Sequence, residues 1–148
     1  MVDCGVMIKN DRQYLEELNT KMRKIYDSIG RVFCPALQKI VVFNAKGFHH
    51  LHYLPNGKPR TAVEQMYKLR LIPLATAVVR NSSNVLEERC KIVRLVRRRH
   101  SKLVVAKQYA LIATVGRKPI TVRVVVMEFN NSQNPIFWSI MINKKTIE

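Results

Sequence analysis

Three histidines within four positions, His49, His50 and His52, are the side chains of this sequence best suited to proton transfer. Histidine has an ordinary pKa close to neutrality. Cleavage of RNA by internal transfer needs a base for the 2′-hydroxyl proton, an acid for the leaving 5′-oxygen and cations that stabilise the phosphorane. One histidine with several arginines or lysines could supply all three. The alternative is that these histidines are surface or half-buried side chains without a chemical role.

Metal binding is a further alternative, because His49 and His52 would be i, i+3 neighbours on a helix. No acidic or cysteine ligand lies nearby in the sequence to complete such a site. Ser139 has no GxSxG context, and Walker and dinucleotide glycine patterns are missing from a chain with five glycines. We therefore expect neither a metal centre nor a cofactor.

A basic cluster spans residues 89–107, with eight Lys or Arg and no acidic residue. Residues 97–102 are expected at the tip of a hairpin, where guanidinium groups can bind phosphate oxygens bidentately. The alternative is a solvated hairpin that only aids solubility. Tyr109 and Trp138 could stack on bases, although aromatic residues in a central sheet are more often part of the core. The predicted nucleic-acid-binding residues are Lys91, Arg94, Arg97, Arg98, Arg99, Lys102 and Tyr109.

Two further arginines stand apart from this cluster. Arg60 follows a Pro/Gly-rich loop, and Arg123 lies within an apolar run at residues 122–127. An arginine in such a run needs a paired acid, an open face or a substrate phosphate. Glu128 could be that acid, or a general base. An exposed structural role for these arginines stays open beside a catalytic one.

The first half of the chain predicts helices. Apolar residues recur at steps of three and four over residues 11–29, and Gly30 would end that helix. Thr61, with Glu64 three positions later, predicts the cap of a second long helix reaching residue 80. Pro73 predicts a kink or break within it. Between the two helices we expect a strand at residues 40–43 and a helical turn at 47–52.

The second half predicts four strands, at residues 86–96, 108–115, 120–129 and 137–142, joined by short turns into an antiparallel meander. Helices followed by strands predict an α+β fold, with the N-terminal helices packed on one face of a four-stranded sheet. Alternation places Ser139 opposite Trp138 and Ile140. The same pattern leaves four polar residues on the open face: Arg89, Lys91, Arg123 and Ser139.

The 148 residues suffice for one domain, with an N-terminal helix at 1–35, a short strand and helices at 36–85 and the sheet at 86–143. Lys and Arg number 26 against 10 Asp and Glu, a net charge of +16 and a pI near 10.3. Such an excess favours a phosphate-bearing partner, with an anionic membrane surface as the rival. No apolar run approaches a membrane span, no signal peptide is evident, and three cysteines in no ligand pattern favour reduced thiols. We expect a cytoplasmic protein without a membrane partner.

The segment FNAKGFHHL at residues 43–51 resembles an F-x-x-x-G-F-x-H-L element. The segments that follow strengthen the likeness: GKPR at 57–60, EQ at 64–65, LIPLA at 71–75, VRVVV at 122–126 and FWSI at 137–140. Together they resemble proteins of the barnase–EndoU–colicin–RelE-like (BECR) fold, which occurs among phage and toxin–antitoxin nucleases. The resemblance covers residues 40–143.

This resemblance implies a metal-independent endoribonuclease whose active site lies on the open face of the sheet. It implies that His50 transfers protons and that Arg60 and Arg123 hold the scissile phosphate. Arg89 would join them, and Ser139 would hydrogen-bond the phosphate or orient the histidine. It also implies a toxin whose partners are RNA, the ribosome and an acidic antitoxin or inhibitor protein.

The main alternative is a non-catalytic RNA- or ribosome-binding module in which the histidines are incidental. A DNA-binding regulator is a weaker alternative, because no helix-turn-helix is evident and the basic cluster lies on a predicted hairpin. Salt-dependent binding is expected of the nuclease and of the module alike.

Overall fold

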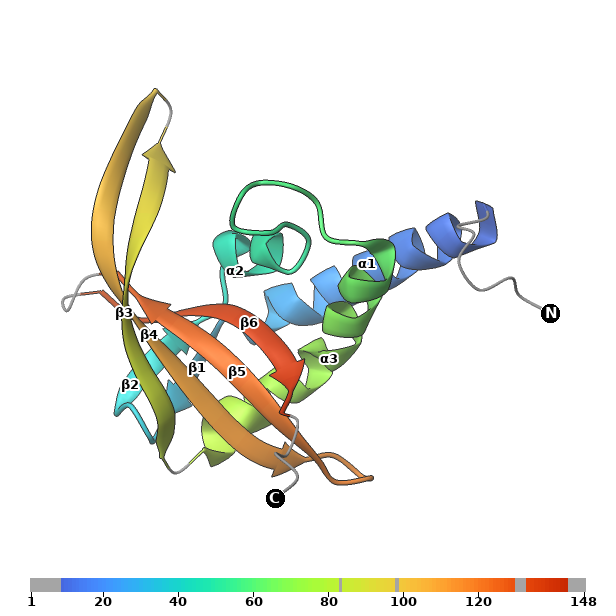
Figure 1. Cartoon of the computed structure of the whole chain (residues 1–148). Helices are drawn as coiled ribbons and strands as arrows, with labels where there is room; N and C mark the ends of the chain where they lie inside the picture. Colours follow the sequence, from blue (N-terminus) through green and yellow to red (C-terminus); the bar gives the residue numbers. More distant parts are fainter. Residues whose placement is uncertain (1–8, 83, 98, 130–132, 144–148) are drawn as a thin grey trace, which may run out of the picture.

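The computed structural model describes residues 9–82, 84–97, 99–129 and 133–143. In these residues three helices and six strands form an α+β fold (Figure 1). The helices are α1 (Lys9–Ile29), α2 (Ala45–His50) and α3 (Ala62–Asn81). The strands are β1 (Arg31–Cys34), β2 (Lys39–Val42), β3 (Val85–Arg97), β4 (His100–Val115), β5 (Ile120–Glu128) and β6 (Ile136–Ile142).

The sheet has the order β1-β2-β6-β5-β4-β3. Strands β3 to β6 form the predicted antiparallel meander. The prediction of a four-stranded sheet is wrong, because the hairpin β1–β2 joins it to make six strands. β2 corresponds to the strand expected at residues 40–43, and it pairs with β6 in parallel at Val42 and Ile136. β1 lies within the segment assigned to the N-terminal helix. It is a four-residue strand with alternating exposure, which starts directly after Gly30 at φ 65°.

Helix α3 runs unbroken through Pro73, contrary to the break that the proline predicts. Pro73 itself is exposed, whereas Leu69, Ile72 and Ala75 on the opposite side are buried against the rest of the core. Burial of these side chains holds the helix together despite the missing backbone donor. At the other end the predicted cap is present, since the Thr61 hydroxyl accepts a hydrogen bond from the Glu64 amide at 3.2 Å.

The hydrophobic core lies between the helices and one face of the sheet. Val122, Val124 and Val126 point into it, which leaves Arg123 on the opposite face, as the alternation in this strand predicted. Phe43 and Phe137 stack with ring centroids 4.8 Å apart, and the Tyr26 ring meets both edge-on. This aromatic group joins α1 to β6.

Gly47 fixes how α2 sits on β6. A Cβ atom at this position would lie 2.6 Å from the Tyr26 hydroxyl oxygen and closer still to the Phe137 carbonyl oxygen. Only glycine permits that approach. The Asn44 side chain caps α2 by accepting from the Lys46 and Gly47 amides, and the Tyr26 hydroxyl donates to the Asn44 carbonyl at 2.6 Å. The short helix is thereby held against β6, and its last residue, His50, is brought to the sheet.

The hairpin of β3 and β4 extends beyond the rest of the sheet. β4 pairs with β5 only from Lys107 onward, so residues 91–97 and 100–106 pair only with each other. We call this two-stranded ribbon, together with Arg99 in the turn between its strands, the arm. Figure 1 shows it rising past the other strands, at the level of α2.

Candidate active site

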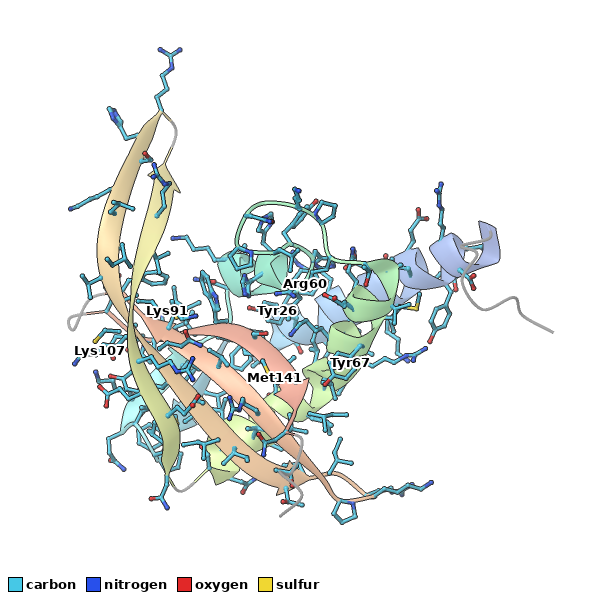
Figure 2. The ribbon with its side chains drawn as sticks, in the orientation of Figure 1. Tyr26, Arg60, Tyr67, Lys91, Lys107 and Met141 are labelled. Carbon is cyan, nitrogen blue, oxygen red and sulfur yellow. The ribbon has the colours of Figure 1, made fainter. Side chains whose placement is uncertain are left out.

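A cleft of about 1350 Å³ lies on the face of the sheet opposite the core. Side chains of α2 and the loop after it form one wall, and the base of the arm forms the other. In Figure 2, Arg60 lies beside the loop and Lys91 lies at the base of the arm, one on each wall of the cleft. The floor comes from β4, β5 and β6 and consists of Gln108, Val125, Met127, Trp138, Ser139 and Met141.

His50, the last residue of α2, projects into this cleft beside Trp138, with ring centroids 4.8 Å apart. Burial, and after it the positive charges of Arg60 and Lys68, lower the pKa of His50 to about 4. The imidazole is therefore neutral at pH 7. Neither ring nitrogen has a hydrogen bond to a residue that the structure describes. A neutral ring with a free nitrogen can accept a proton from a bound molecule.

Lys68 reaches the cleft from α3. Its ammonium donates to the Ser139 hydroxyl at 2.9 Å and to the Ile140 carbonyl at 3.0 Å, so one of its three N–H groups is left for a bound molecule. Burial lowers the pKa of Lys68 to about 8, with Arg60 acting in the same direction and Glu64 opposing it. The group is mostly protonated at pH 7, yet it gives up its proton more readily than an ordinary lysine.

Arg60 is fixed at the rim by contacts along its whole length. Its Nε donates to the His50 carbonyl at 3.1 Å, and its Nη1 lies 3.5 Å from the Glu64 carboxylate. Gln65 donates to the Arg60 carbonyl at 2.8 Å. The guanidinium has five N–H groups, so these contacts orient it and leave donors for an anion.

The electrostatics of the cleft favour an anion. Among the described lining residues there is no Asp or Glu, and six carry a positive charge: Arg23, Lys46, Arg60, Lys68, Lys91 and Arg94. The described part of the chain also holds no group of three or more His, Cys, Asp and Glu side chains that could bind a metal ion. Cations converging without carboxylates are suited to phosphate.

Arg89 and Arg123 lie on the predicted open face but outside the cleft lining. Both are paired with Glu87, Arg89 at 3.0 Å and Arg123 at 3.4 Å. The structure therefore does not bring them together with His50. Glu128 is not their partner either, because it is buried on the other face and accepts from Lys39 at 2.6 Å. This contact raises the pKa of Lys39.

The predicted nucleic-acid-binding residues divide into three groups. Lys91 and Arg94 line the cleft, while Arg99 and Lys102 are exposed further along the arm. The Arg97 side chain and Arg98 lie outside the described residues. Tyr109 requires a correction, since it is 8% exposed and belongs to the core, where its ring cannot reach a base.

The two remaining members of the histidine cluster have structural contacts. His52 lies between the Asn19 side chain at 2.6 Å and the Phe48 carbonyl at 2.9 Å, and so joins α2 to α1. Burial lowers its pKa. His49 is exposed and stacks on Tyr53, with centroids 4.4 Å apart. Of the three histidines, His50 is the one beside Lys68 and the sheet.

Lys68 and Gln108 were missed as site residues, whereas Trp138 was considered for base stacking beside a place in the core. A signal for Lys68 existed, because it falls in step with Ile72, Ala75 and Val79 on the buried side of α3, where a lysine is unusual. Trp138 was assigned to the face opposite Ser139. A register shift at Val125 and Val126 places both side chains at the cleft.

No helix in the described ranges has the length and apolar character needed to cross a membrane. Comparison of the chain with protein-family models, with curated protein sequences and with solved structures finds no match.

Proposed function

We propose that this protein is a metal-independent endoribonuclease with a BECR-like fold, which cleaves RNA by transesterification. The observation that carries the proposal is the pairing of a neutral histidine with a charged lysine in one cationic cleft. The charge of Lys68 lowers the pKa of His50, and Arg60 lowers the pKa of both. Perturbed titratable groups that converge in a cleft are typical of active sites.

In this reaction His50 is the general base. Its free ring nitrogen takes the proton of a ribose 2′-hydroxyl, and the 2′-oxygen attacks the adjacent phosphorus. Lys68 is the general acid and donates its remaining proton to the 5′-oxygen as the P–O bond breaks. The products are a 2′,3′-cyclic phosphate and a 5′-hydroxyl. A water that later opens the ring would leave a 3′-phosphate.

Arg60 and Ser139 stabilise the phosphorane. Arg60 supplies a fixed guanidinium, and its attraction to the phosphate oxygens strengthens as these oxygens gain negative charge. The Ser139 hydroxyl accepts its hydrogen bond from Lys68, so its own proton is free to be donated to a phosphate oxygen. The arm adds Lys91, Arg94, Arg99 and Lys102 as contacts to the RNA backbone outside the cleavage site.

The resemblance to toxin–antitoxin nucleases suggests a substrate for this activity. We propose that the substrate is cytoplasmic RNA, either free or on the ribosome. We also propose an acidic inhibitor protein, which the net charge of +16 would attract.

The proposal is tested by incubating the protein with total RNA in excess EDTA and comparing wild type with His50→Ala. His49→Ala is the matched control, because His49 is the adjacent, exposed histidine on the same short helix and also lines the cleft, but its ring stacks on Tyr53 and not on Trp138. We expect cleavage by wild type and by His49→Ala, and its loss in His50→Ala, which still binds RNA in low salt. Binding without cleavage by all three proteins would favour the non-catalytic RNA-binding module instead.

A further inference from the structure

The floor of the cleft contains a polar group that the proposed chemistry does not use. Gln108 lies on β4, and its Oε1 atom is buried without a hydrogen-bond partner in the described structure. A buried acceptor without a donor is costly, and a bound molecule that supplies an N–H would remove that cost. Gln108 is directly paired with Arg89 and Met127, so it faces the same side of the sheet as the cleft.

Trp138 and Gln108 line the same cleft, although the residue directly across β5 from Gln108 is Ile136, two positions before Trp138. The two residues stand on β6 and β4, which β5 separates, so their backbones are about 10 Å apart. Val125 and Met127 of β5 form an apolar floor between them. His50 and Phe129 contact the indole at centroid distances of 4.8 and 5.7 Å and hold its orientation. An apolar slot with an aromatic ring at one side and an amide at the other suits a flat heterocycle.

We infer that this slot is a nucleobase subsite, in which Trp138 stacks on a base and Gln108 reads its edge. The inference rests on the proposed function and adds a base preference to it. A glutamine amide pairs bidentately with the N6 and N7 edge of adenine, and a purine offers the larger ring for stacking. The subsite therefore prefers adenine. Because His50 touches the same indole, the base in the slot belongs to a nucleotide next to the scissile phosphate.

Trp138 is the only tryptophan of the chain, so its fluorescence reports on the slot directly. The test titrates the full-length protein with AMP, GMP, CMP and UMP, with ribose 5-phosphate as a probe that lacks a base. We expect saturable quenching by AMP at the lowest concentration and none by ribose 5-phosphate. Gln108→Met, which keeps the side-chain length, should weaken AMP binding roughly tenfold and leave UMP binding nearly unchanged. Gln13→Met, on the exposed surface of α1, is the control.

Equal quenching by all four nucleotides that Gln108→Met does not alter would overturn the inference, as would no quenching by any of them. Circular dichroism of the variant shows whether it is folded. The subsite and the proposed nuclease activity are contradicted by different results. AMP binding without RNA cleavage supports the subsite and contradicts the nuclease, whereas RNA cleavage without base preference or AMP binding contradicts the subsite alone.

Discussion

The proposed cleavage should depend on pH through two groups of one cleft whose pKa values lie far apart. His50 must be neutral to accept a proton, and its pKa is about 4. Lys68 must be protonated to donate one, and its pKa is about 8. The value of kcat/KM should therefore be level between about pH 4 and pH 8, and fall roughly tenfold per pH unit on either side. At pH 3 and at pH 9 we expect roughly a tenth of the plateau.

Substrate binding should move the acidic limb of the pH–rate profile, which is the fall in rate at low pH. Positive charges contribute to the low pKa of His50, and a phosphate bound among them opposes their effect. The pKa of His50 in the complex is then higher than in the free protein. Because kcat reports the complex and kcat/KM reports the free protein, the acidic limb of kcat should lie at higher pH.

Arg60→Met is the perturbation that tests this reasoning. Arg60 lowers the pKa of both His50 and Lys68, so its removal should shift both limbs to higher pH. The assay follows a fluorogenic RNA oligonucleotide from pH 3 to pH 10, with EDTA present and each profile scaled to its own maximum. Arg123→Met, an arginine outside the cleft lining, should keep both limbs in place. Circular dichroism at each pH confirms that the protein is folded.

Two results would refute the reasoning. An acidic limb near pH 6.5 in wild type would mean that His50 is solvated or is not the base. If both limbs of the profile keep their pH values in Arg60→Met, the groups that titrate are not His50 and Lys68.

Three further outcomes are expected. Gly47→Ala should cost at least about 2 kcal/mol in denaturant unfolding, because its Cβ would overlap the backbone of Phe137; a change below about 0.5 kcal/mol would contradict the close approach. Arg60→Met should lower plateau kcat/KM by roughly 100-fold, and Arg123→Met by less than roughly threefold, since only the first lines the cleft; equal losses would contradict this placement. Neutralising Arg94, Arg99 and Lys102 of the arm should reduce the slope of log K against log salt by about 2 for single-stranded RNA. An unchanged slope would exclude phosphate contacts by these residues.

Local patterns predicted much of the fold. The apolar steps of residues 11–29, the Thr61 cap and the alternation in β5 each depend on neighbours in sequence, and each is present. The strand β1 was missed because it has four residues, two of them buried, and exists through its pairing with β2. The length of β4 was missed for a similar reason, since its first residues pair only with β3 and carry exposed apolar side chains such as Leu103 and Val105.

The site was predicted in part. His50, Arg60 and Ser139 meet in one cleft, as the resemblance implied. Arg89 and Arg123 share the open face, but sequence alone could not show that Glu87 pairs with Arg123 as well as with Arg89, because the contact with Arg123 joins positions 36 residues apart. Lys68 could not be placed beside Ser139 without knowing that α3 lies against β6, a contact across 71 residues of chain.

The central claim is transesterification by the ribose 2′-hydroxyl, with His50 and Lys68 moving the protons. The most direct measurement maps a cleavage site in an RNA oligonucleotide in EDTA and then replaces the single nucleotide on its 5′ side by the 2′-deoxy form. We predict that wild type cuts the all-ribose strand and leaves a 2′,3′-cyclic phosphate, and that it does not cut the substituted strand at the deoxy position. Continued cleavage at the deoxy position, or loss of all cleavage in EDTA, would contradict it.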